Sequence, residues 1–269
     1  MKQSTALLSM ISLVAVTVNV FAEDKQAITG TEIIAKHIAA VGGAEAIAKF
    51  KSRVAVGTVK KENEPDANMA IVSEAPNRVS AVYVFRNYNW QLTYDGSKTI
   101  FRPQVSKDAS VVEDKQREML ATGAMFNSIS LYSVLIQPGS DVKFDAKGTK
   151  KVKGRPAYVV EAKVANKPSV LLYFDAESFM WVRTDYGRVR FTKSIGTFSN
   201  NVVQHGEDET EVEFYFETSD FREVDGVKLP FRFEQVVASP IIRQKRVGTI
   251  IGTISEYKHN VPIDPKMFQ

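Results

Sequence analysis

The chain contains no cysteine. It therefore has no disulfide framework, no thiol nucleophile and no cysteine to which a lipid anchor could be attached. Stability must come from the burial of apolar side chains, and 269 residues are enough for a large hydrophobic core. We expect a protein that is held together by packing alone.

Long apolar runs are scarce, and the one near the N-terminus has the features of a secretory signal. Lys2 is followed by an apolar stretch over 6–18, and the pattern Val20-Phe21-Ala22 is one that signal peptidase accepts. An uncleaved membrane anchor is the alternative, but polar residues interrupt the stretch, which is shorter than the roughly 18–20 apolar residues that span a bilayer. We expect residues 1–22 to be removed and the mature protein to be periplasmic, in an envelope of the Gram-negative type.

Histidine is rare, and the common catalytic motifs are absent. The three histidines, His37, His205 and His259, lie far apart, which is not the spacing of a local set of metal ligands. The sequence has no G-x-S-x-G, H-E-x-x-H, P-loop or dinucleotide fingerprint. We expect no catalytic residue, no metal site and no cofactor, with His37 a partly packed flank of the first helix. An envelope hydrolase with an unrecognised site is the less favoured alternative.

Charge of one sign is not strongly concentrated. The net charge is +4, and its spread along the chain argues against nucleic acid as a partner. The acidic run 205–211 lacks the order of a calcium loop and reads as a solvated hairpin tip. The sharpest basic cluster has two open interpretations, contact with anionic lipid or protection of a sheet edge; it comprises Lys147, Lys150, Lys151, Lys153 and Arg155.

Helix signals occur at the start of the mature chain and in its middle. We expect a helix capped by Thr31 and ended by Gly42-Gly43, and a second short helix over 44–50. A helical insertion near 108–137 is expected to hold one helix beginning at Ser110 and another over 126–136. The second of these is apolar almost all round, so it must be covered.

The rest of the chain shows strand patterns. Segments 53–59, 68–73, 78–85, 91–94 and 99–101 are rich in β-branched and aromatic residues, and Asp95-Gly96 is a hairpin turn signal. After the insertion, strands and turns alternate at short spacing, as at Asp225-Gly226. The predicted fold is mainly β (α+β), an incomplete antiparallel barrel or strongly curved sheet, in a single domain over 23–269.

Alternation within the strands predicts one dry face. This face and the insertion either fill one another or line a cavity for acyl chains, whose burial contributes about 0.8 kcal/mol per methylene. The predicted wall residues are Val170, Leu172, Phe174, Val212, Phe214, Phe216, Phe231 and Phe233 from the sheet, and Phe126, Leu131 and Leu135 from the insertion.

Several short motifs resemble the outer-membrane lipoprotein-sorting, LolA-like family. They are the segments 33–43, 75–79, 94–96, 224–230 and 257–260. The resemblance implies helices that cover a hydrophobic cavity in a half-barrel, and a periplasmic carrier or receptor for lipid or lipoprotein acyl chains. It also implies that Arg78 holds the helical lid by hydrogen bonds.

The lack of a cysteine for lipid attachment favours a carrier that crosses the periplasm over an anchored receptor. Envelope proteins of the inner or outer membrane are further expected partners. The alternative function is an envelope sensor or protein-interaction module with the same fold.

Overall fold

The computed structural model describes residues 28–102, 122–136, 141–192, 209–239 and 245–269. The predicted signal peptide, the helix expected at Ser110, and His205 lie outside these residues. The side chain of Val212 also lies outside the description, although its backbone belongs to a strand.

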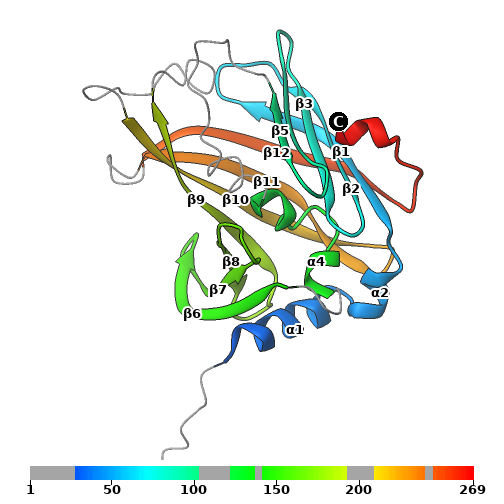
Figure 1. Ribbon diagram of the computed structural model, residues 1–269, viewed down its shortest axis with the longest axis vertical. Coiled ribbons are helices and arrows are strands. Elements are labelled where there is room, and N and C mark those ends of the chain that lie inside the picture. Colours follow the sequence, from blue (N-terminus) through cyan, green and yellow to red (C-terminus); the bar gives the residue numbers. More distant parts are fainter. Residues whose placement is uncertain (1–27, 103–121, 137–140, 193–208, 240–244) are drawn as a thin grey trace, which may run out of the picture.

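One antiparallel sheet of twelve strands contains both halves of the chain. Its order is β5-β4-β3-β2-β1-β12-β11-β10-β9-β8-β7-β6, so β5 and β6 form its two edges and the sheet is not closed. Figure 1 shows that the sheet is strongly bent, with the long strands β9–β12 between its two ends. The predicted mainly β, incomplete-barrel fold is confirmed. The strands are β1 Ser52–Lys61, β2 Ala67–Glu74, β3 Arg78–Val84, β4 Asn89–Tyr94, β5 Thr99–Arg102, β6 Lys143–Val152, β7 Arg155–Lys163, β8 Val170–Asp175, β9 Trp181–Thr192, β10 Glu209–Val224, β11 Val227–Ser239 and β12 Lys245–His259.

Turn chemistry explains two of the hairpins. Between β4 and β5, the Asp95 carboxylate accepts hydrogen bonds from the backbone N–H groups of Ser97 and Lys98. Between β10 and β11, Asp225 and Gly226 adopt φ angles of 51° and 80°, which suits a short left-handed turn. Both turns were predicted from the sequence.

The N-terminal helix α1 Gly30–Ala40 begins at a different cap from the predicted one. Thr29, not Thr31, is the N-cap, and it forms a capping box with Glu32. The spacing Thr-x-x-Glu is the usual signature of this motif. The helix ends before Gly42 and Gly43, as predicted, and α2 Ala44–Ala48 follows.

Residues 122–136 lie between β5 and β6, and we call them the insertion segment. The continuous helix predicted over 126–136 is wrong: the structure has a helical turn at 122–125, several turns, and the one-turn helix α4 Ser133–Ile136. The Asn127 side chain accepts a hydrogen bond from the Ile129 N–H, an arrangement that competes with helical backbone bonding. A last short helix, η1 Pro265–Phe268, lies near the C-terminus and contacts β3.

Apolar side chains are buried on both faces of the sheet, but unequally. The main hydrophobic cluster joins α1, α2, the insertion segment and inward-facing residues of most strands. A small cluster of Val152, Ala157, Val159 and Tyr173 lies on the opposite face of β7 and β8, since neighbouring residues of a strand alternate between faces. Among the described residues, no helix is long and apolar enough to cross a membrane.

Candidate functional site

The structure brings the predicted wall residues together. The ten whose side chains are described all lie in the main hydrophobic cluster, each less than about one tenth exposed. They come from β8, β10, β11 and the insertion segment. Val212 lies in β10 opposite Val189. These residues form one contiguous apolar region; whether they contact a lipid stays a prediction.

The insertion segment packs into this apolar region. The sequence predicts that this segment is covered by protein or by an apolar ligand, and in the structure protein covers it: Phe126 is 0% exposed, Ile129 1% and Tyr132 1%. Because it has little regular structure, some of its buried backbone polar groups have partners outside the segment.

Hydroxyl groups of the sheet supply some of these partners. The Thr184 hydroxyl donates to the carbonyl of Phe126 over 3.1 Å. The N–H of Leu131 donates to Ser73 Oγ over 3.2 Å. A further contact joins two side chains, since the hydroxyls of Ser128 and Thr218 are 3.3 Å apart.

Arg53 provides the charged contact to the insertion segment. Its Nη1 donates to the carbonyl oxygens of Ser130 (2.7 Å) and Ile129 (3.2 Å). The residue is 1% exposed, and its guanidinium lies 5.5 Å from the ring centre of Tyr132 and 6.0 Å from that of Tyr257. Burial lowers the pKa of Arg53, and the two tyrosines oppose this shift. A positive charge is thus held inside the protein by neutral dipoles and rings.

A histidine and an aspartate continue the chain of polar contacts from Arg53. The Nε of Arg53 is 3.0 Å from Nε2 of His259, and Nδ1 of His259 is 2.7 Å from the Asp225 carboxylate. Phe50 stacks on the imidazole at 3.8 Å. A histidine beside a carboxylate is a component of many hydrolase sites, but here Arg53 takes the position where a nucleophile would contact Nε2.

Arg78, the arginine predicted to hold a lid, has other partners in the structure. Its Nη1 lies 2.5 Å from Glu74 Oε2, and its guanidinium stacks 4.1 Å from the ring centre of Phe268. The lid role of Arg78 stays a prediction.

The sequence analysis did not identify Arg53 as a functional residue. A usable signal was its place on the same face of a strand as Ala55, which faces the core.

His37 is a buried residue and not the partly packed flank that was predicted. It is 0% exposed, and its ring lies against Phe174 and Trp181. Nδ1 is 2.9 Å from the carbonyl oxygen of Phe179. Burial lowers its pKa to about 4, and the bond to Phe179 opposes the shift. His37 is therefore a neutral part of the core at ordinary pH.

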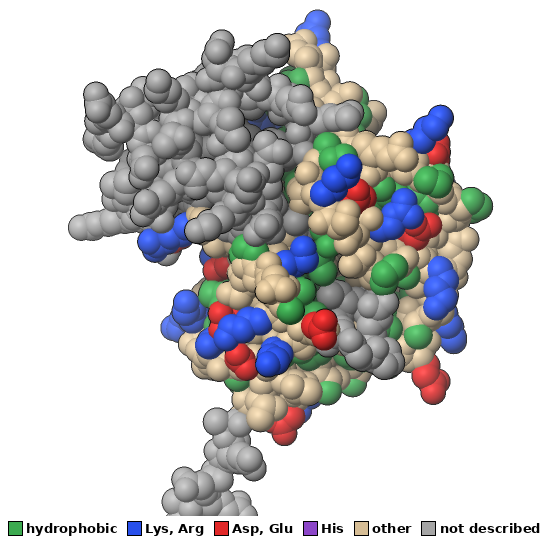
Figure 2. All heavy atoms as spheres, in the orientation of Figure 1, with side chains coloured by type: hydrophobic (Ala, Val, Ile, Leu, Met, Phe, Trp, Pro, Cys, Tyr) green, Lys and Arg blue, Asp and Glu red, His purple; other side chains and the backbone are tan. Residues whose placement is uncertain are grey.

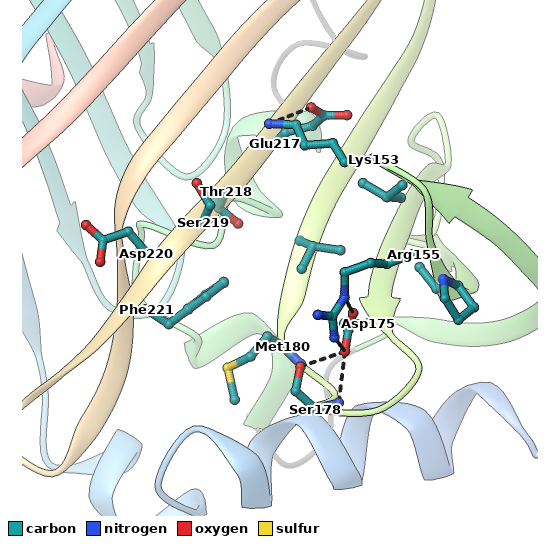
Figure 3. Close-up of a pocket in the computed structure, with 14 residues that line it drawn as sticks. Lys153, Arg155, Asp175, Ser178, Met180, Glu217, Thr218, Ser219, Asp220 and Phe221 are labelled. Carbon is teal, nitrogen blue, oxygen red and sulfur yellow. Dashed lines mark hydrogen bonds and ion pairs between the residues drawn. The ribbon is translucent and has the colours of Figure 1, made fainter.

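A separate pocket of about 290 Å³ lies between the tip of the β6–β7 hairpin, the β8–β9 turn and β10. Figure 3 shows Lys153 directed toward Glu217 at one end and Arg155 toward Asp175 at the other. None of the predicted wall residues lines this pocket. Its charged rim is occupied by ion pairs within the protein.

Ion pairs also neutralise part of the positive charge of the basic cluster that the sequence predicted. Lys147 pairs with Glu161, Lys153 with Glu217 and Glu234, and Arg155 with Asp175 and Glu177. Figure 2 shows acidic and basic side chains interspersed over this part of the surface. Within the described ranges, no group of three or more His, Asp or Glu side chains could hold a metal ion.

Comparisons with known proteins give a likeness of structure only. No protein-family model matches the sequence, and no curated protein matches it in a sequence search. The structure is similar to that of a LolA superfamily protein from Nitrosomonas europaea, with 14% identity, 90% of this chain and 98% of the other covered, and a TM-score of 0.46.

Two further solved structures show a likeness of the same kind. One is a DUF1329 family protein from Desulfovibrio piger, with 10% identity, 89% and 95% covered, and a TM-score of 0.42. The other is an outer membrane lipoprotein-sorting protein domain from Vibrio parahaemolyticus, with the same four values. The family that the sequence motifs resemble is thus also named among the solved structures to which this chain is similar.

Proposed function

We propose that the protein is a periplasmic carrier of lipid or of lipoprotein acyl chains. It takes them up on the concave face of the bent sheet, by which we mean the face that the insertion segment covers, when this segment moves away. The observation that carries the proposal is the way this segment is held. It is apolar and buried, and the side chains of Arg53, Thr184 and Ser73 on the sheet make hydrogen bonds to its backbone.

This arrangement suits exchange with a greasy cargo. Apolar surface that the segment leaves on the sheet can be covered by methylene groups without directional bonds, at about 0.8 kcal/mol per methylene. The segment is not a strand of the sheet, so it can leave without breaking the ladder of β-strands. The proposal requires no catalytic group and no cofactor.

The signal-peptide pattern over residues 1–22 supports the periplasmic location. The name of one similar structure supports the cargo class, since it is an outer membrane lipoprotein-sorting protein domain. Envelope proteins that deliver or receive the cargo are further partners in this proposal.

The test is lipid binding by the purified mature protein. We expect lipid in organic extracts of the protein, seen by mass spectrometry, and saturable binding of a fluorescent fatty acid. Val84→Asn changes an apolar side chain that is 49% exposed, so it controls for adhesion to the surface and should leave binding unchanged. An empty protein that also fails to bind the fluorescent fatty acid contradicts the proposal.

The second candidate is an envelope sensor or protein-interaction module. It is favoured by one observation, the burial of the described wall residues, each less than about one tenth exposed, which fits a solid core as well as a closed carrier. Recovery of a stoichiometric envelope protein, without lipid, from cells that express the tagged chain would favour it.

A further inference from the structure

The contact between His259 and Arg53 defines the protonation state of the imidazole. A guanidinium N–H can only donate a hydrogen bond. The Nε of Arg53 is 3.0 Å from Nε2 of His259, so Nε2 must accept. The proton of the neutral ring is then on Nδ1, from which it donates to Asp225 over 2.7 Å. The observed geometry therefore requires a neutral His259.

Protonation of His259 removes this acceptor. Nε2 would then carry an N–H that points at the N–H of Arg53, and two positive charges would face each other at hydrogen-bond distance. The same guanidinium holds the carbonyls of Ile129 and Ser130. Any movement of Arg53 away from a charged His259 therefore disturbs the contact with the insertion segment.

The surroundings of the pair act on this coupling in both directions, since burial disfavours a charged imidazole and the Asp225 carboxylate favours one. The titratable and charged groups that face it are Asp225 from the β10–β11 turn, Tyr257 from β12 and Tyr132 from the insertion segment. Phe50, from the end of α2, covers the imidazole. The side chain of His259 is 3% exposed, so water and salt screen its interaction with Arg53 only weakly.

We infer that His259 and Asp225 are positioning residues for Arg53, and that acid opens the insertion segment by protonating His259. The inference deepens the proposed function, on which its role in cargo exchange rests, but the opening can be measured without cargo. Burial lowers the pKa of His259, the bond to Asp225 opposes this, the charge of Arg53 lowers it further, and the charge of Asp225 raises it.

Linkage between proton binding and opening gives the direction of the pH dependence. The closed state binds the proton less well than an open state in which Arg53 has left, so opening increases as pH falls below the pKa of the open state. For each unit that separates the two pKa values, full protonation raises the opening equilibrium about tenfold.

The experiment measures deuterium uptake by the peptide 122–136 between pH 8 and pH 5 in the wild type, His259→Gln and His259→Phe. The glutamine offers an amide oxygen to Arg53 and does not titrate. The phenylalanine keeps the stacking on Phe50 and offers no acceptor. Because this peptide is identical in all three proteins, its intrinsic exchange rate cancels at each pH.

We expect the wild type to match His259→Gln at pH 8 and to approach His259→Phe, with about tenfold faster uptake, toward pH 5. Asp225→Asn should raise uptake at pH 8 by a smaller factor, since Nδ1 keeps a hydrogen-bond acceptor. A ratio of wild type to His259→Gln that stays constant across this range would overturn the inference. If the ratio changes as expected but no lipid binds, the carrier proposal fails and the positioning role stands.

Discussion

At the scale of single residues, Arg53 is unusual because its described hydrogen-bond acceptors are all neutral. They are two carbonyls and an imidazole. A buried cation without a carboxylate gains less than an ion pair does, and its desolvation remains costly. Such a contact stabilises the closed position of the insertion segment only weakly, so a change in pH that protonates His259 can offset it.

Replacement of Arg53 should release the segment locally. We expect Arg53→Met to increase deuterium uptake over 122–136 at least tenfold at pH 8, because a hydrogen bond from a charged group is worth about 1.5–3 kcal/mol. Arg53→Lys, with one ammonium in place of a planar fork, should cause a smaller increase.

The matched control is Arg78→Met, which removes an arginine of the same sheet that contacts Glu74 and Phe268. Uptake over 122–136 should stay at the wild-type level in this variant. If Arg78→Met opens the segment and Arg53→Met does not, the predicted lid role of Arg78 is supported and that of Arg53 is rejected.

His37 should make the protein sensitive to acid. Its pKa of about 4 in the fold lies below its ordinary value of 6.5, so protons bind preferentially to the unfolded chain. Stability is fully present above pH 6.5 and falls as pH drops toward 4, by about 3 kcal/mol from this group. Urea unfolding at several pH values measures the slope.

His37→Phe is the control for this prediction. It keeps an aromatic ring among Phe174 and Trp181 and removes the titration, although it loses the bond to Phe179. The variant should be less stable at pH 8 and show a shallower loss of stability between pH 6.5 and pH 4. An unchanged slope would assign the acid sensitivity to other groups.

The residues that the sequence identified best were those whose role is local. Asp95 shapes its turn through its own carboxylate, and Asp225 and Gly226 through their own positive φ angles, so all three could be predicted. Arg53 and His259 act through partners up to 206 residues apart in the sequence, so their pairing depends on the register of β1 with β12. No local pattern carries that information.

At the scale of elements, the corner between α1 and α2 is joined to the β10–β11 turn. The N–H of Lys228 donates to the carbonyl of Val41 over 2.8 Å. Gly42, with φ of +130°, lies so close that a Cβ atom would be 2.2 Å from the carbonyl oxygen of Gly226. This corner therefore places the helices beside Asp225, which contacts His259 and, through it, Arg53.

Gly42→Ala should lower the free energy of unfolding by about 2–4 kcal/mol, through backbone strain and the clash with Gly226. Gly43→Ala is the matched control, because its φ is +90° but a Cβ atom there meets nothing within 4 Å. Strain alone predicts about 1–2 kcal/mol. Urea denaturation of both variants gives the comparison, and equal losses would mean that the contact with Gly226 contributes nothing.

Strands were predictable and the insertion segment was not, for a physical reason. The strands have a period of two that the residues themselves display, as in Val170, Leu172 and Phe174. The segment 126–136 is apolar on all sides, so periodicity alone does not distinguish a helix from a buried irregular chain. In the fold its backbone is bonded to Thr184, Ser73 and Arg53 on the sheet, and no local pattern reveals these partners.

At the scale of the whole molecule, the curved open sheet and its dry face could be predicted, because alternation and turn spacing are properties of the chain. How the insertion segment fills the concave side could not be predicted. It depends on how the side chains of the insertion segment fit those of β8, β10 and β11, and packing complementarity is decided in three dimensions. The distinction between a solid core and a closed carrier is therefore an experimental one.

A reversible disulfide can make that distinction, because the chain has no cysteine of its own. The hydroxyls of Ser128 and Thr218 are 3.3 Å apart, so Ser128→Cys with Thr218→Cys should join the insertion segment to β10. If the segment must leave before acyl chains enter, the oxidised protein should lose binding of a fluorescent fatty acid, and a reductant should restore it. The control pair is Ser80→Cys with Thr93→Cys, whose hydroxyls are 2.8 Å apart between β3 and β4; it should bind in both redox states. Equal binding by the oxidised and reduced Ser128–Thr218 pair would show that cargo enters without displacing the segment, and the concave face would then have to be abandoned as its site.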